Sequence, residues 1–171
     1  FKATDIIVVC NPIKSADGLH KWRRVTQISE VRKHWEEDPV AEGGFADLLK
    51  YDSETDQLQP TQELINGESE ILKSIAGKVK EWAGNWDAVW DNIQLRAKIK
   101  KTIVEMAEKT NDDDLLEAPF VIKSNDEFHR ISDKVRQKEG NLDSEKIFFE
   151  WNEWLKRQVK KRNMRNNGGN F

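Results

Sequence analysis

The longest apolar run in the chain is Ile6-Ile7-Val8-Val9-Cys10. A continuous apolar run of this length is typical of a strand that is buried on both faces. Turn residues follow at Asn11-Pro12 and at positions 15–18. The next stretch, residues 21–31, alternates only imperfectly, but its content of β-branched residues favours a second strand. We therefore expect an antiparallel hairpin in which Cys10 is a small buried hydrophobic residue rather than a nucleophile.

Further strands and a set of helices are expected after this hairpin. Residues 44–51 and the short segment 57–59 have strand character, and after Pro60 the apolar residues recur at steps of three and four. Amphipathic helices are predicted at residues 68–82, 85–109 and 125–138, and a fourth helix is predicted after Asp143. The sequence thus predicts an α+β fold, with a small antiparallel sheet followed by a bundle of about four helices.

These patterns divide the chain into three segments. We expect a β-rich segment at residues 1–60, a helical domain at residues 61–165 and a disordered tail at residues 166–171, which are polar and rich in glycine. The chain also opens almost directly on a strand, which suggests an excerpt from a longer protein.

Composition narrows the class of function. The net charge is -3, so no overall positive field exists to hold phosphates, and this argues against a general nucleic-acid binder. The longest apolar run is too short to span a membrane, and no signal peptide is visible. With a single cysteine as well, the composition fits a reducing cytoplasm.

The sequence contains no self-sufficient active site. It lacks the phosphate-binding pattern Gly-x-x-x-x-Gly-Lys-Ser/Thr, and its histidines, His20, His34 and His129, lack the spacing of metal ligands. Three consecutive carboxylates at positions 112–114 do not converge on one ion, so a solvated turn is the favoured interpretation. We therefore predict no catalytic residue, no metal site and no cofactor bound by this chain.

Several segments, taken in order, resemble the carboxy-terminal part of archaeal motor ATPases of the type II/type IV secretion superfamily. Residues 5–9 and 22–31 are similar to two strands at the end of the RecA-like core in that family. The second of these carries the family's arginine–arginine–valine–x–x–isoleucine–x–glutamate pattern at residues 23–30. Segments 49–58 and 71–96 follow in the family's order. The resemblance covers roughly residues 1–138, and residues 139–171 look like an extension.

The resemblance implies a hexameric ring that hydrolyses ATP with magnesium and drives a pilus, an archaellum or a secretion machine through a membrane platform protein. It implies a cytoplasmic position at the inner face of the membrane. Because the nucleotide motifs are missing here, we expect this chain to be a non-catalytic part that contributes to subunit packing and force transmission and does not hydrolyse ATP alone. The alternative is a free-standing α+β protein-interaction module with no link to ATP.

The resemblance also points to individual residues. Arg23 and Arg24 match the family's paired arginines, and a guanidinium suits a phosphate sensor or an inter-subunit ion pair. A solvated strand face, or pairing with Glu30, is the favoured alternative. Glu30 and Arg96 complete the set of nucleotide-proximal or inter-subunit candidates.

A basic patch is predicted near the end of the last helix, at Lys156, Arg157, Lys160, Lys161 and Arg162. Such a patch could contact anionic lipid or nucleic acid. The helix dipole also stabilises cations at the carboxy-terminal end of a helix. We therefore favour a solvated helix end and expect no nucleic-acid partner.

Overall fold

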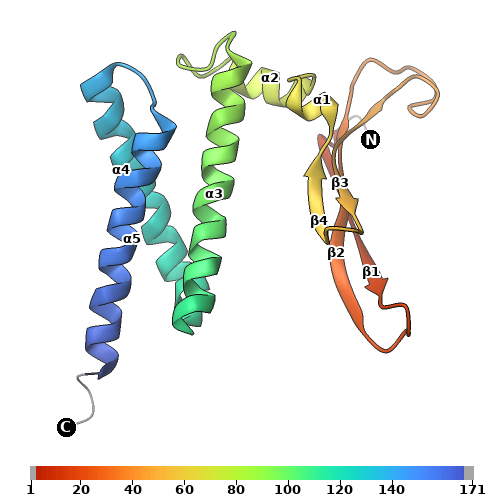
Figure 1. Cartoon of the computed structure of the whole chain (residues 1–171). Helices are drawn as coiled ribbons and strands as arrows, with labels where there is room; N and C mark the ends of the chain where they lie inside the picture. Colours follow the sequence, from red (N-terminus) through yellow and green to blue (C-terminus); the bar gives the residue numbers. More distant parts are fainter. Residues whose placement is uncertain (1–2, 168–171) are drawn as a thin grey trace. The chain divides into compact units, whose positions relative to one another are not determined.

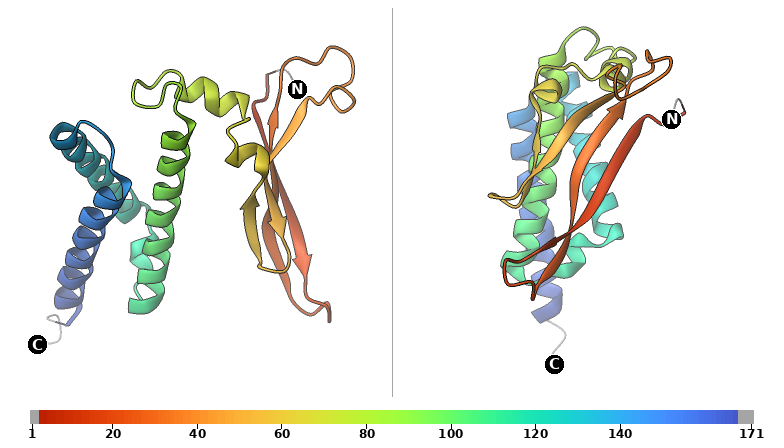
Figure 2. Two further views of the ribbon diagram at one scale, coloured as in Figure 1. Left: turned by 45° about the horizontal axis from the view of Figure 1, so that its top comes forward. Right: turned by 90° about the vertical axis from the view of Figure 1, so that its right-hand side faces the viewer.

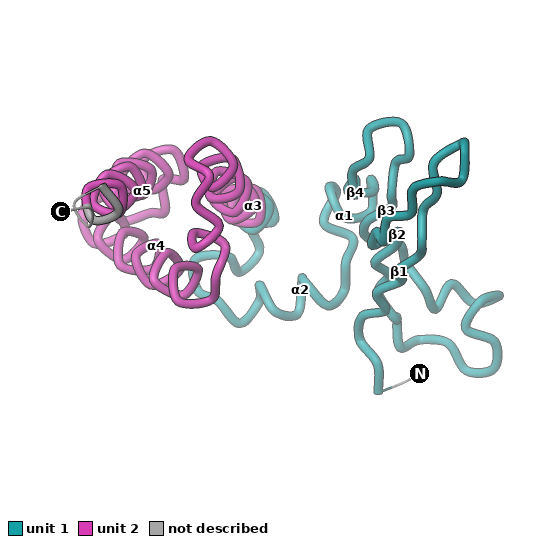
Figure 3. The backbone as a smooth tube through the Cα atoms, turned by 90° about the horizontal axis from the view of Figure 1, so that it is seen from below, with its two compact units in different colours: residues 1–90 teal, residues 91–171 magenta. Residues whose placement is uncertain are grey.

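The structure is a computed structural model that describes residues 3–167, with side chains up to residue 164 (Figure 1). The chain forms two compact units, Phe1–Trp90 and Asp91–Phe171 (Figure 3). Four strands are followed by helices, which confirms the predicted α+β fold. The strands end at Pro60, where the β-rich segment was expected to end, and two short helices after them still belong to the first unit.

The first unit is built on an antiparallel sheet in the order β1-β2-β3-β4. The strands are β1 (Ile6–Lys14), β2 (Lys21–Val31), β3 (Phe45–Asp52) and β4 (Gln57–Pro60). β1 pairs with β2 from Ile6 to Lys14, as the predicted hairpin requires. β2 pairs with β3 only from Gln27 onward, so residues 10–25 extend beyond the sheet as a two-stranded hairpin arm (Figures 1 and 2).

β1 is an edge strand with exposed apolar side chains. Ile6 is 39% exposed and Val8 is 54% exposed, and Cys10 is exposed as well. The prediction of a strand buried on both faces, with a buried Cys10, is therefore wrong. A continuous apolar run is buried on both faces only where other elements cover it, and no strand of the described residues pairs with the outer edge of β1.

Two short helices, α1 (Gln62–Ile65) and α2 (Glu70–Ala76), follow the sheet. α1 packs against β3. The buried apolar residues of this unit are Val31, Ala46, Leu48, Leu64, Ala76 and Val89. The helix predicted at residues 68–82 is shorter than expected, because α2 ends at its C-cap Gly77 and turns follow. Glycine is a poor helix former, so it favours termination at this point.

Trp86, the first residue of α3 (Trp86–Thr110), holds the start of this helix against the end of α1 and the residues that follow it. The indole Nε1 of Trp86 donates a hydrogen bond of 2.8 Å to the carbonyl oxygen of Ile65. Gly67 has a φ of +73°, and a Cβ at this position would come within 2.5 Å of the Trp86 ring. Only glycine combines this backbone conformation with the space that the ring occupies.

The second unit contains three long helices. α3 continues into it, and η1 (Asp113–Leu116), a short 3₁₀ helix, precedes α4 (Ala118–Glu139) and α5 (Ser144–Asn167). The predicted caps are present: Asn85 Oδ1 accepts the Ala88 N–H at 3.2 Å, and Asp143 Oδ1 accepts the Lys146 N–H at 2.9 Å.

The ends of α4 and α5 refine the predicted helix bounds. α4 begins at Ala118 rather than at residue 125, because proline is tolerated in the first turn of a helix and Pro119 therefore does not block it. It ends at Gly140, as predicted. α5 runs through Asn167, so it includes the first two residues of the segment that was expected to be disordered. Residues 168–171 of that segment lie outside the described residues.

The core of the second unit is formed by all three long helices and η1. Its buried residues are Leu95, Ile99, Ile103, Ala107, Leu115, Phe120, Phe128, Ile131, Val135, Ile147, Trp151, Trp154, Leu155 and Val159. Trp151 and Leu155 are completely inaccessible to solvent. The indole N–H of Trp151 reaches the hydroxyl of Ser124 at 3.3 Å, so this buried donor is satisfied.

We expect Leu155→Ala to lower the free energy of unfolding of the second unit by about 2–5 kcal/mol, because it removes buried contacts and leaves a cavity. Denaturant unfolding followed by near-ultraviolet circular dichroism measures this loss. Leu116→Ala is the matched control, since Leu116 is 46% exposed and its truncation should cost less than about 1 kcal/mol. Equal losses in the two variants would contradict the placement of Leu155 in the core.

Candidate functional site

The four predicted nucleotide-proximal or inter-subunit residues belong to different surroundings. Arg23, Arg24 and Glu30 all lie on β2 in the first unit, whereas Arg96 lies on α3 in the second unit. Arg23 and Arg24 lie on opposite faces of β2, because successive side chains of a strand point to opposite faces. Glu30 lies beyond the register shift of β2 against β1. Each residue is therefore described with the partners that it contacts.

Glu30 is a fully buried carboxylate at the start of α2. Its Oε1 accepts the Glu70 N–H at 2.9 Å, and its Oε2 accepts the Ile71 N–H at 3.3 Å. The hydroxyl of Ser69, the N-cap of α2, also donates to Oε2. Amide groups in the first turn of a helix lack partners within the helix, and the helix dipole favours a negative charge there. Glu30 therefore caps α2 from a neighbouring strand.

A cation lies beside this carboxylate. Arg32 Nε is 3.9 Å from Glu30 Oε1, and another nitrogen of the same guanidinium is 3.8 Å from Glu63. Arg32 Nε has no hydrogen-bond partner among the described residues, so its attraction to Glu30 is electrostatic. Together, backbone donors and this charge offset the cost of burying the carboxylate. Its predicted role near a nucleotide or a neighbouring subunit stays a prediction.

Arg24 is bound at the base of the hairpin arm by the turn between β3 and β4. Its Nε and one terminal nitrogen donate to the two carboxylate oxygens of Asp56, each at 2.8 Å. The Tyr51 hydroxyl also donates to Asp56 at 2.8 Å. The hydrogen bond from Arg24, followed by the one from Tyr51, lowers the pKa of Asp56 to about 2. Arg24 is therefore paired with Asp56 and not with Glu30, which the sequence suggests as an alternative partner of the two arginines.

The other two arginines have exposed side chains. Arg23 makes no ion pair within the described residues. Arg96 donates to Asn92 at 3.2 Å, and its guanidinium lies 4.8 Å from the centroid of the Phe128 ring. This cation–π contact joins α3 to α4. Arg96 therefore has a packing role in the second unit, whereas the guanidinium of Arg23 is available to an outside partner.

The predicted basic patch is only partly free. Lys156 pairs with Glu153 at 2.7 Å, and Arg162 bonds both Asp112 and Asp114 at 2.7 Å. The described residues form no ion pair with Arg157, Lys160 or Lys161. The carboxylates at positions 112–114, which were expected in a solvated turn, lie in and just before η1. Two of them, Asp112 and Asp114, bind Arg162 of α5. Arg162 lowers the pKa of Asp112 through their hydrogen bond.

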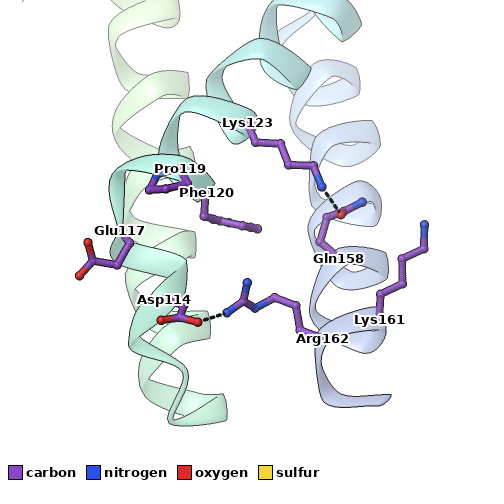
Figure 4. A pocket seen from close by; sticks show the side chains of 8 residues that line it. All are labelled: Asp114, Glu117, Pro119, Phe120, Lys123, Gln158, Lys161 and Arg162. Atoms are coloured by element: carbon purple, nitrogen blue, oxygen red, sulfur yellow. Dashed lines mark hydrogen bonds and ion pairs between the residues drawn. The ribbon is translucent and has the colours of Figure 1, made fainter. Parts of the chain in front are cut away.

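A pocket of about 630 Å³ lies where η1, the start of α4 and the end of α5 meet (Figure 4). It is lined by Asp114, Glu117, Pro119, Phe120, Lys123, Gln158, Lys161 and Arg162. Lys123 donates to the Gln158 side chain at 2.8 Å, and Arg162 points toward Asp114. The ammonium of Lys161 points away from Arg162. Because the inward polar groups mostly satisfy one another, the lining supports helix packing and singles out no ligand.

Three partners in these contacts, Asp56, Ser69 and Asp112, were not identified from the sequence. Ser69 carries a local signal, since serine is a preferred N-cap before a helix. Asp56 lies 32 positions from Arg24, and Asp112 lies 50 positions from Arg162. No local pattern specifies pairs at such separations.

Comparisons with known proteins leave the family open. No family model, curated protein or solved structure matches the chain. Within the described residues, no group of three or more histidine, cysteine, aspartate or glutamate side chains could hold a metal ion. No described helix is long and apolar enough to cross a membrane.

Glu30→Gln should destabilise the start of α2. The neutral amide keeps one acceptor oxygen, but its NH₂ group would face the Ser69 hydroxyl or the backbone N–H groups, which are themselves donors. We expect a loss of about 2–3 kcal/mol in the stability of the first unit. Amide hydrogen exchange at Glu70 and Ile71 should accelerate in the same variant. Glu63→Gln is the matched control, since that side chain is 41% exposed. Unchanged exchange at both amides in Glu30→Gln would show that the carboxylate does not cap α2.

The pKa of Asp56, followed by the carboxyl chemical shift in an NMR titration, should lie near 2. A depressed carboxyl pKa stabilises the fold above the ordinary value of 3.8, and this contribution is lost as the pH falls toward 2. Arg24→Gln should raise the pKa of Asp56 toward 3.8, whereas Arg23→Gln should leave it unchanged. Equal responses to the two substitutions would contradict a specific bond from Arg24.

Proposed function

We propose that this chain is the carboxy-terminal, non-catalytic part of a hexameric secretion or pilus-assembly motor ATPase, where it contributes to subunit packing and force transmission. The resemblance at residues 23–30 motivates this proposal. In it, ATP and magnesium bind to another part of the parent protein, and the ring lies against the inner face of the membrane beside a platform protein.

The observation that carries the proposal is the open edge of β1. Its first half, from Ile6 to Val9, has exposed apolar side chains, and no strand of the described residues pairs with its outer edge. Free-standing proteins usually protect such an edge with proline, lysine or a covering element. Here Pro12 and Lys14 lie in the arm, beyond the apolar half. An unprotected apolar edge is expected where a sheet continues into a neighbouring segment or subunit.

The contacts inside the first unit support the force-transmission part of the proposal. Glu30 connects β2 to the first turn of α2 through three hydrogen bonds. Trp86 connects the start of α3 to α1 through its indole hydrogen bond. A displacement of the sheet would therefore act on the beginning of the long helix through defined contacts rather than through a loose linker.

A free-standing interaction module is the second candidate, because the same open edge could accept a strand from another protein. The two candidates differ in what precedes this sequence in its reading frame. A Walker A loop upstream supports the motor, whereas a start codon immediately before Phe1 supports the module.

Val8→Lys should weaken ring assembly of the parent ATPase, because it places a charge on the apolar half of the open edge. We expect fewer hexamers in native mass spectrometry and a matching fall in ATP turnover. Val40→Lys is the matched control, since Val40 is also exposed but lies in the loop before β3. The isolated chain should hydrolyse no ATP at all. Turnover by the isolated chain, or intact hexamers of the Val8→Lys parent, would contradict the proposal.

A further inference from the structure

The hairpin arm combines two features that are unfavourable in water. Lys14 and Lys21 lie directly opposite each other, and like charges at such a position destabilise a strand pair. Neither forms an ion pair with a described residue. At the tip, Leu19 is 78% exposed. Local conflicts of this kind in a well-formed hairpin point to a surface that relieves them.

The charge of the arm differs in sign from that of the whole chain. Lys14, Lys21 and Arg23 share one face of the arm, because cross-strand partners and alternate residues point the same way. The one carboxylate, Asp17, is used inside the turn, where it accepts the Leu19 N–H at 2.9 Å and the Ser15 hydroxyl. The arm holds four cations and one anion. Arg24 is paired with Asp56 outside the arm. The other three cations still outnumber the anion, so the arm is locally positive, whereas the chain carries -3.

Apolar and aromatic groups occupy the tip and the opposite face. Trp22 is 43% exposed and lies across from Ile13 on the face away from the lysines. Its ring centroid is 6.2 Å from that of His20. Tryptophan is favoured at the boundary between headgroups and acyl chains, and a leucine at a turn can enter the apolar layer.

We propose that the hairpin arm docks on an anionic lipid surface, with Leu19 and Trp22 at the acyl boundary and the three cations among the headgroups. A bilayer supplies both an apolar layer and negative charge, so one occupant relieves both conflicts. The contact is weak for a single arm and strengthens when several arms bind together. It does not depend on the proposed motor function, since a single arm can make the contact and no nucleotide is involved.

Cosedimentation of the full chain with phosphatidylcholine vesicles tests the docking. Vesicles with about 30 mol% phosphatidylserine should bind the chain at low salt, and binding should weaken steeply toward about 1 M salt. Vesicles of phosphatidylcholine alone should bind far less. Brominated acyl chains should quench the fluorescence of the bound chain, and Trp22→Phe should remove most of this quenching.

Lys14→Glu is the decisive variant, because it creates an ion pair with Lys21 and so strengthens the arm while it removes positive charge. We expect it to lower vesicle binding at least about tenfold. Lys160→Glu on α5 makes the same charge change in the predicted basic patch and should alter binding less than about twofold. Leu19→Ser should weaken binding, and Val40→Ser, at a position of similar exposure, should not.

Three results would overturn the proposal. The first is the absence of binding to the anionic vesicles. The second is a loss in Lys160→Glu as large as that in Lys14→Glu, which would place the contact on α5. The third is tighter binding to single-stranded nucleic acid than to vesicles through the same lysine, which would make the arm a nucleic-acid contact.

Discussion

The carboxylate of Glu30 is buried between β2 and the first turn of α2, and the organisation of the first unit depends on it. Three donors converge on it, two of them amides that have no partner inside their own helix. Water cannot replace the carboxylate at a site without solvent access, so removal of its charge leaves these donors unsatisfied. A short helix that is marginal alone is thereby fixed to the sheet.

The same residue types serve opposite purposes in the two units. On α5, Arg162 is bound by two carboxylates in and before η1, and Lys156 pairs with Glu153 of its own helix, so only Arg162 of the predicted basic patch contributes to packing between elements. On the arm, Lys14 and Lys21 face each other without a carboxylate partner among the described residues. A count of cations along the sequence favours α5, but each surface has three cations without an ion pair among the described residues. On the arm, these three cations share one face with no carboxylate on it.

Local signals predicted the elements that are specified locally. The hairpin, the bounds of α3 and the caps Asn85 and Asp143 follow from alternation, periodicity and capping chemistry. The errors concern tertiary surroundings: the apolar run at β1 was expected to be buried, but it lies at an edge. The partner of Arg24 was equally hidden, because Asp56 lies in a distant turn. An apolar pattern shows which side chains favour burial. Whether they are buried depends on which other elements cover them.

The arrangement of the elements also allows β1 to take part in two contacts, one through its apolar edge and one through the hairpin arm. The register of β1 against β2 shifts between Val9 and Cys10, close to the point where β2 loses its pairing with β3. Bulges of this kind increase the local twist of a strand and redirect the residues beyond them. The apolar, unprotected half of β1 therefore lies on one side of the shift, and the charged arm lies on the other. Since the two halves share no side chain, a strand or subunit that covers Ile6 and Val8 would leave Lys14 and the tip of the arm free to bind a surface at the same time.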